Sequence, residues 1–224
     1  MRQGLSEAQV EAALGDLERA DLPAKTVAAL RLVDGTGEFT IAQVADALRV
    51  RPSSLYNHVS SKGEIVEAMR SLVFREGGVF REGGLEAGDS GPWEQTVRAL
   101  LRRYRECFAR HQRLIPLVTA YTVSSPEVMG MYDELAETLG AAGVPDSQLL
   151  DVITMCDSVV LGAALDLAAP DEVWAVNQAR SRALISAIQQ AGSGRERSDR
   201  AFELALDILV AGVASMVETG SPVA

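Results

Sequence analysis

The chain has 224 residues, of which 47% are apolar and 23% are charged, and it carries a formal net charge of −10. This composition excludes a mostly disordered chain and is enough for one large domain or two small ones with a buried core. Two cysteines are too few for a disulfide framework or a Cys-based zinc site, so we expect a reducing cytoplasm, no metal and no cofactor. We also expect no signal peptide and no membrane span, because the apolar run 208–217 is far shorter than the roughly 20 residues that a bilayer requires.

Apolar residues recur at intervals of three and four along the whole chain, which predicts an all-α fold without strands. Glycine and proline positions separate the expected helices. In chain order these helices cover 5–20, 24–33, 41–48, 52–59, 62–73, 93–111, 114–121, 126–139, 147–167, 171–190 and 198–217.

Capping signals mark two of the helix starts. Thr40 is followed three residues later by Gln43, which is the pattern of a capping box, and Ser61 with Glu64 repeats it. A Gly-rich segment follows, in which Phe-Arg-Glu-Gly-Gly occurs twice, at 74–78 and 80–84. We interpret this segment as a flexible connector. The predicted domains are an N-terminal helical extension (1–22), a small helical domain (23–75), the linker (76–92) and a larger helical domain (93–224).

The charge is unevenly distributed. Residues 24–75 hold seven basic and five acidic side chains, whereas the segments before and after them are net acidic. The overall negative charge therefore argues against non-specific binding along DNA. The basic segment 24–75 can still make a local contact with DNA.

Two short helices joined by a turn, 40–48 and 52–59, have the dimensions of a helix-turn-helix. The start of the second helix is the part that enters a major groove, and side chains there can hydrogen-bond base edges. The candidate base contacts are Arg51, Ser53, Ser54 and Asn57. Tyr56, His58 and Lys62 carry donors that suit phosphate oxygens.

The run from Thr40 through Ala45, Leu48, Leu55-Tyr56-Asn57-His58 and Lys62 resembles the DNA-binding signature of the tetracycline-repressor (TetR) family. The resemblance implies a three-helix DNA-binding head joined to a helical domain that binds ligands and forms dimers. The resemblance implies that Thr40 is a phosphate contact as well, together with Tyr56, His58 and Lys62. Arg49 stands where the family often has glycine, and Ala42 stands where it can have a base-contacting arginine.

The second half contains two strongly apolar helices, 147–167 and 198–217, and the second of them is rich in small residues. Together they would expose apolar surface in a monomer, so we expect a homodimer built on both helices. An arginine-rich stretch, 98–113, is interpreted as a partly paired surface, with an anionic ligand or a contact to the head as alternatives. The candidate effector-pocket residues are Tyr104, Phe108, His111, Leu117, Tyr121, Met131, Met155 and Trp174, although each of them also suits a plain core.

These observations favour a cytoplasmic, homodimeric transcriptional regulator. It would act as a repressor that binds a pseudo-palindromic operator on double-stranded DNA and leaves it when a small-molecule effector binds. The alternative is a helical ligand- or protein-binding dimer with a vestigial DNA head, which Arg49 and Ala42 support. An enzyme is not expected, since Cys107 and His111 lie four residues apart with nothing in the sequence to orient the imidazole as a base.

Overall fold

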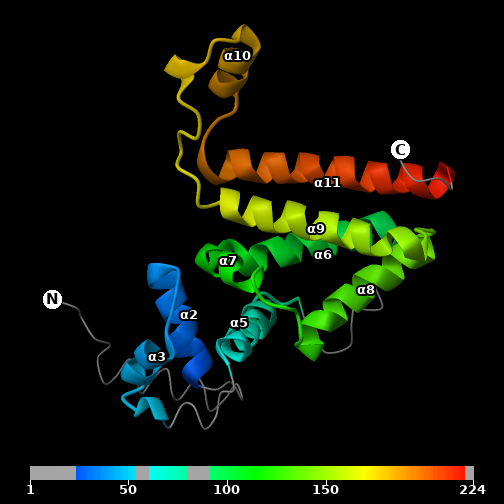
Figure 1. The fold of residues 1–224 in the computed structure, drawn as a ribbon. Coiled ribbons are helices and arrows are strands. Elements are labelled where there is room, and N and C mark those ends of the chain that lie inside the picture. The colour runs from blue at the N-terminus through cyan, green and yellow to red at the C-terminus, as the bar shows by residue number, and fades with distance from the viewer. Residues whose placement is uncertain (1–23, 54–60, 80–90, 220–224) are drawn as a thin grey trace. The chain divides into compact units, whose positions relative to one another are not determined.

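The computed structural model describes residues 24–53, 61–79 and 91–219, and every regular element within these ranges is helical (Figure 1). The predicted all-α fold is confirmed for this part of the chain. Two compact units are formed: the first holds Met1–Val73 and Arg113–Val128, and the second holds Phe74–Gln112 and Met129–Ala224. In this division Arg113–Val128 belongs with the first unit, whereas the sequence pattern predicted one continuous helical domain over 93–224.

The first unit contains α2 (Ala24–Thr36), α3 (Ile41–Ala47) and most of α5 (Lys62–Glu76). α2 and α3 pack against each other. The apolar side chains of the three helices and of the loop before α3 form a small core, because they recur at helical spacing. Its fully buried members include Ala29, Val33, Phe39, Val44, Ile65, Val66 and Met69.

A buried ion pair on α5 binds the segment that follows α6, and both belong to the first unit. Arg70 and Glu67 on α5 lie 3.2 Å apart, and their side chains are only 5% and 11% exposed. Arg70 donates hydrogen bonds to the carbonyl oxygens of Val118 and Tyr121, and the Glu67 carboxylate accepts one from the backbone N–H of Ser124 at 2.8 Å. Charged groups thus satisfy backbone groups that would otherwise be buried without partners.

Two further contacts fix the same segment, which contains η1 (Gln112–Leu114) and α7 (Ile115–Val118). Arg113 donates to the carbonyl oxygens of Asp34 and Gly35 at the end of α2. The hydroxyl of Ser71 donates to Ser125 at 2.7 Å. Residues 113–125 therefore pack with α2 and α5 through hydrogen bonds as well as through apolar contact.

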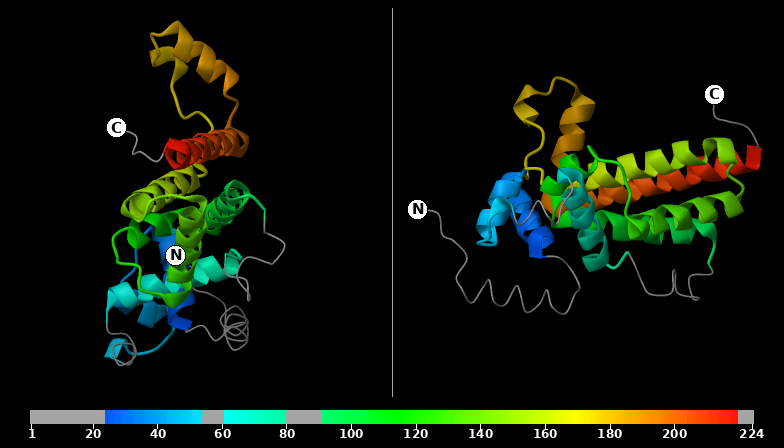
Figure 2. Two further views of the ribbon diagram at one scale, coloured as in Figure 1. Left: turned by 90° about the vertical axis from the view of Figure 1, so that its right-hand side faces the viewer. Right: turned by 60° about the horizontal axis from the view of Figure 1, so that its bottom comes forward.

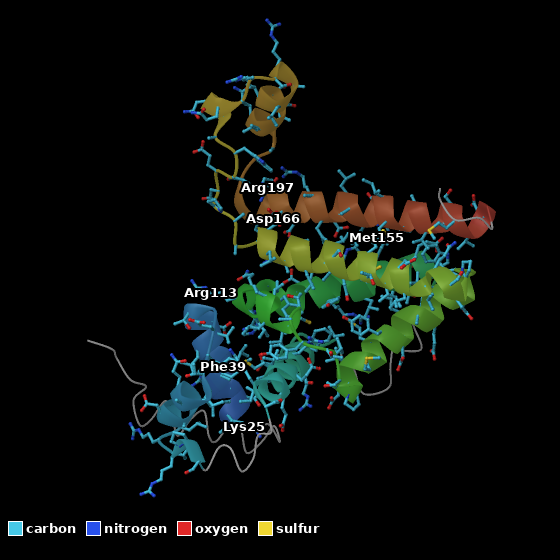
Figure 3. The ribbon with its side chains drawn as sticks, in the orientation of Figure 1. Lys25, Phe39, Arg113, Met155, Asp166 and Arg197 are labelled. Carbon is cyan, nitrogen blue, oxygen red and sulfur yellow. The ribbon has the colours of Figure 1, made fainter. Side chains whose placement is uncertain are left out.

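The second unit contains α6 (Trp93–Ala109), most of α8 (Pro126–Ala142), α9 (Asp146–Asp166) and α11 (Gly194–Thr219). α9 packs against both α6 and α11, and α9 and α11 run antiparallel, as both views show (Figures 1 and 2). At one end of the pair Arg197 is ion-paired with Asp166 at 2.8 Å (Figure 3). At the other end Val217 approaches Gly143, where a Cβ atom would stand 3.1 Å from its Cγ1.

The length and composition of α9, with 21 residues, would suffice to cross a membrane, and only 28% of the apolar window in it is buried. The prediction of no membrane span was made from the run 208–217, and the apolar helix 147–167 was interpreted instead as part of a dimer interface. Core helices of water-soluble proteins pass the same test. The middle of α9 also carries Asp157, which accepts a hydrogen bond from the hydroxyl of Tyr132 on α8 at 3.0 Å. α9 packs on α6 and α11, and its exposed residues are mixed: Leu150, Met155 and Leu165 stand among the polar residues Asp151, Thr154 and Ser158.

The segment between α9 and α11 forms an arm that contains η2 (Val176–Gln178) and α10 (Arg182–Gln190). The helix predicted over 171–190 was wrong in its first half, since the α-helix begins only at Arg182. Ser181 caps that helix by accepting the backbone N–H of Leu184 at 3.5 Å. Serine favours this position over a helix interior, because its hydroxyl competes for backbone hydrogen bonds.

The arginine-rich stretch is a set of ion pairs that differ in burial. Arg98 pairs with Asp207 at 2.7 Å, and Arg102 forms a bidentate pair with Glu203 in which both side chains are about half exposed. Arg105 is different, since its side chain is 4% exposed. The interpretation of a partly paired surface is therefore confirmed for Arg98 and Arg102, while Arg105 is part of the core.

Arg105 connects three helices. Its guanidinium donates to Asp199 at 2.6 Å, to the Ser198 hydroxyl at 2.8 Å and to the Ala163 carbonyl oxygen at 3.3 Å, and it lies over the ring of Phe202 at 4.7 Å. α6, α9 and α11 are thus held at one point.

We expect Arg105→Met to lower the free energy of unfolding by about 2–4 kcal/mol, because the buried Ser198 hydroxyl and the Ala163 carbonyl lose a charged donor. Arg102→Met is the matched control and should cost less than about 1 kcal/mol, since its ion pair is exposed. Urea denaturation followed by circular dichroism measures both. Equal losses for the two variants would contradict the assigned difference in burial.

Candidate nucleic-acid interface

The start of α3 has the predicted capping box. The hydroxyl of Thr40 accepts the backbone N–H of Gln43 at 3.2 Å, and the side-chain oxygen of Gln43 accepts the backbone N–H of Thr40 at 2.8 Å. The Thr40 hydroxyl also donates to the same side-chain oxygen at 3.0 Å. In a contact with DNA, the Thr40 hydroxyl would therefore donate its hydrogen bond to a phosphate oxygen in place of the side-chain oxygen of Gln43.

The turn after α3 is a Schellman motif with arginine in place of glycine. The N–H of Arg49 bonds to the carbonyl oxygen of Asp46 at 3.0 Å, and that of Val50 bonds to Ala45 at 2.9 Å. Arg49 has φ +55°, a left-handed conformation that glycine adopts without steric cost. The turn expected of a helix-turn-helix thus forms despite Arg49, and this residue no longer supports a vestigial head.

We expect Arg49→Gly to stabilise the chain by about 0.5–1 kcal/mol. The left-handed conformation costs an L-residue about 1–2 kcal/mol, and the greater freedom of glycine in the unfolded chain offsets part of the gain. Thermal or urea unfolding measures the change. Arg51→Gly, at a neighbouring exposed position without positive φ, is the control and should give no gain.

The predicted recognition helix begins with Pro52 and Ser53, which are helical and exposed. Arg51, which precedes the helix, is exposed too. The other predicted contacts on this helix, Ser54, Tyr56, Asn57 and His58, lie outside the described residues.

Lys62, the first residue of α5, is held in place by its neighbours. Its ammonium lies 4.9 Å from the centre of the buried Phe39 ring. Ser61 caps the helix, as predicted, by accepting the N–H of Glu64 at 3.2 Å. A cation beside a helix N-terminus is a combination that favours an anion such as phosphate.

The predicted effector-pocket residues do not form one group. Leu117 and Tyr121 belong to the first unit, where Tyr121 packs so closely on α5 that a Cβ on Gly63 would stand 2.9 Å from its ring. The other six belong to the second unit. Met155 and Trp174 are 40% and 48% exposed there, on α9 and in the arm.

Tyr104, Phe108 and Met131 are buried in the second unit, and His111 is half-buried. Tyr104 and Phe108 pack with Phe74 at ring-centre distances of 5.1–5.9 Å. Burial raises the pKa of Tyr104 well above its usual value, and Tyr132 and Asp157 raise it further. The cluster of Tyr104, Tyr132 and Asp157 thus places polar groups among apolar side chains of α6, α8 and α9, which is a typical composition for a ligand site.

Three residues of interest, Asp157, Glu67 and Arg70, did not stand out in the sequence. Asp157 and Arg70 fall three or four residues from buried apolar positions of their helices, and Glu67 falls three residues before Arg70. That pattern was the available signal, since a charge on the buried face of a helix requires a partner.

The Cys107 thiol has the properties of a core residue. It is buried, it donates to the Arg103 carbonyl oxygen at 3.1 Å, and burial raises its pKa to about 12. A nucleophilic cysteine requires the opposite shift.

Comparison with known proteins places the chain in a family. The model of the tetracyclin repressor-like C-terminal domain matches residues 86–217. The chain therefore belongs to the tetracyclin repressor-like family, a family of transcriptional regulators, as the resemblance of residues 40–62 to the TetR signature indicated.

One curated relative is the HTH-type transcriptional repressor DrrR1 of Streptomyces coeruleorubidus, 28% identical over 139 residues, which are 61% of this chain and 50% of DrrR1. The chain spans about half the length of the curated relatives that it matches. Among solved structures, apo ActR of Streptomyces coelicolor is 22% identical with a TM-score of 0.71, over 88% of this chain and 96% of ActR. BioQ of Mycobacterium smegmatis is 24% identical with a TM-score of 0.62, over 85% of this chain and 96% of BioQ. At these identities the structural likeness establishes the fold.

Proposed function

We propose that this protein is a cytoplasmic, homodimeric transcriptional repressor that binds a pseudo-palindromic operator and is released from it by a small molecule. The observation that carries the proposal is the capped helix α3 with the turn that follows it, residues 40–53. It presents Thr40, Arg51 and Ser53 on its surface within the basic part of a TetR-family chain. BioQ was solved with its natural double-stranded DNA operator, and ActR was solved with actinorhodin. These two complexes support DNA and a small molecule as partners of this chain.

The proposed DNA contacts follow the sequence pattern. Arg51, Ser53, Ser54 and Asn57 read base edges from the start of the recognition helix, and Thr40, Tyr56, His58 and Lys62 bind phosphates. Two such helices in a dimer would meet half-sites about 34–36 Å apart.

The proposed dimer surface is the outer face of α9 and α11. Leu150, Leu204 and Ile208 are 73%, 59% and 65% exposed there. Gly162 and Gly212 lie on the same two helices with open space where a Cβ would stand, which would let a second copy approach closely. An exposed apolar face of this kind on a soluble protein requires a partner.

The proposed effector site is the part of the second unit around Tyr104, Tyr132 and Asp157. An effector there releases DNA only if it binds more tightly to the conformation that does not fit the operator. The chain runs from α6 of the second unit directly into residues 113–125, which are hydrogen-bonded to α2 and α5 within the first unit.

Selection of random-sequence duplex DNA on the purified full chain, at moderate salt, tests the proposal. Enrichment of a palindrome is expected, and its half-site spacing should match one helical turn. A folded dimer that enriches no sequence, with or without candidate effectors, would favour a ligand- or protein-binding dimer instead.

Lys62→Ala should weaken binding to all DNA sequences alike. Loss of one phosphate contact lowers the slope of log affinity against log salt by about one for each bound subunit. Arg51→Ala is the contrasting variant and should relax the preference at one base position by about 1–3 kcal/mol. Fluorescence anisotropy with the selected duplex at four salt concentrations measures both. An unchanged salt slope in Lys62→Ala would show that Lys62 makes no phosphate contact.

A further inference from the structure

A pocket of about 260 Å³ lies in the second unit, where the arm meets the start of α11. It is lined by 171–174 on one side, by Ile188 and Ala191 of α10 on another, and by Arg197. Its volume is close to the lower end of the range for ligand sites, about 300–1,000 Å³. Trp174 is the only one of the predicted effector residues that lines it.

The positive charge in this pocket is already balanced. Arg197 is 10% exposed and pairs with Asp166 at 2.8 Å, which also lowers the pKa of that carboxyl, and its guanidinium lies 5.4 Å from the centre of the Trp174 ring. The Nε of Arg197 is buried without a hydrogen-bond partner among the described residues, but an anion bound there would also meet the carboxylates of Asp171 and Glu172 in the lining.

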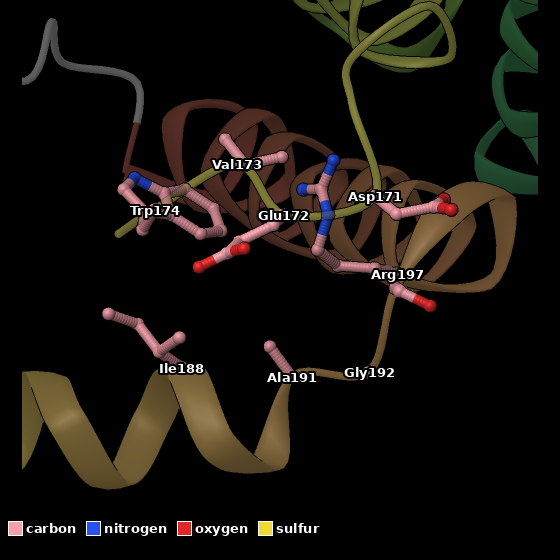
Figure 4. Close-up of a pocket in the computed structure, with 9 residues that line it drawn as sticks. Asp171, Glu172, Val173, Trp174, Ile188, Ala191, Gly192 and Arg197 are labelled. Carbon is pink, nitrogen blue, oxygen red and sulfur yellow. The ribbon is translucent and has the colours of Figure 1, made fainter. Parts of the chain in front are cut away.

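The two lining carboxylates have different surroundings. Asp171 lies beside the first residue of α11, since its Oδ1 is 3.1 Å from the place of a Cβ on Gly194. A carboxylate there is stabilised by the helix N-terminus. Glu172 makes no hydrogen bond or ion pair with any residue that the structure describes. Figure 4 shows its carboxylate between Trp174 and Ile188.

The geometry points to a binding site for a small organic cation with a flat apolar body. The cationic group binds Glu172, and the flat body packs on the indole of Trp174 beside this carboxylate. An exposed indole, a carboxylate without a partner among the described residues and the apolar side chain of Ile188 together match both parts of such a ligand, through a cation–π contact, an ion pair and apolar burial. This site is separate from the proposed effector site around Tyr104, and its ligand would join α10 to the first turn of α11.

Titration of the full chain with benzyltrimethylammonium tests the site. In a Trp93→Phe background Trp174 is the remaining tryptophan, and its fluorescence should change with a saturable dependence on the cation. Glu172→Gln should weaken binding about two- to fivefold, as expected for a partly exposed ion pair. Trp174→Leu, followed by calorimetry, should weaken it by a similar factor.

Matched controls separate this site from unspecific binding. Glu137→Gln, at an exposed position on α8, should leave the affinity unchanged. Neopentylbenzene, which has the same shape without the charge, should bind about tenfold more weakly, and phenylmethanesulfonate should not bind. Equal affinity for the cation and its neutral analogue, or an unchanged affinity in Glu172→Gln, would overturn the proposal. Because no DNA is present, these results do not depend on the proposed function.

Discussion

Arg70→Met is expected to lower the free energy of unfolding by about 3–5 kcal/mol. The variant leaves the carboxylate of Glu67 buried without its cation and removes the donor from the carbonyl oxygens of Val118 and Tyr121. It should also detach residues 113–125 from α5, so their backbone amides should exchange hydrogen faster. Urea denaturation and hydrogen exchange measure the two effects.

Arg75→Met is the control on the same helix, since Arg75 is exposed, and its cost should be below about 1 kcal/mol. The double variant Arg70→Met/Glu67→Leu should be more stable than Arg70→Met, because no buried charge remains. If the loss of unfolding free energy in the double variant equalled the sum of the losses in Arg70→Met and Glu67→Leu, the two side chains would not be coupled.

Ile208→Asp is expected to turn the dimer into a monomer. A buried Ile contributes about 1.5–3 kcal/mol to an interface, and a carboxylate facing its own copy across a two-fold axis adds a desolvation and repulsion cost. Together these effects should raise the dimer dissociation constant roughly a thousandfold. Light scattering coupled to size-exclusion chromatography should give the mass of one chain, 23.9 kDa, instead of two.

Leu184→Asp is the matched control, since Leu184 is 47% exposed on α10 and lies outside the α9–α11 face. It should leave the mass unchanged. Operator affinity should fall in Ile208→Asp and not in Leu184→Asp, because a monomer reaches only one half-site. A dimeric Ile208→Asp would place the subunit interface elsewhere.

The amino-acid sequence by itself determined the helical fold, the capped starts of the helices at 41 and 62, and the family. These features depend on local patterns, namely apolar spacing, capping residues and a short motif, which need no knowledge of distant partners. The same reasoning failed over 171–181, since the helix predicted for 171–190 is not α-helical before Arg182.

Only the tertiary structure decided which charged residues are buried. Arg102 and Arg105 lie three residues apart with the same chemistry, yet one is exposed and the other joins three helices. Their partners, Glu203 and Asp199, are about 100 residues away, so the sequence pattern could not assign them. The pairing of Arg70 with the 113–125 segment and the pocket at Trp174 likewise depend on contacts between distant segments, because burial is a property of the packed chain.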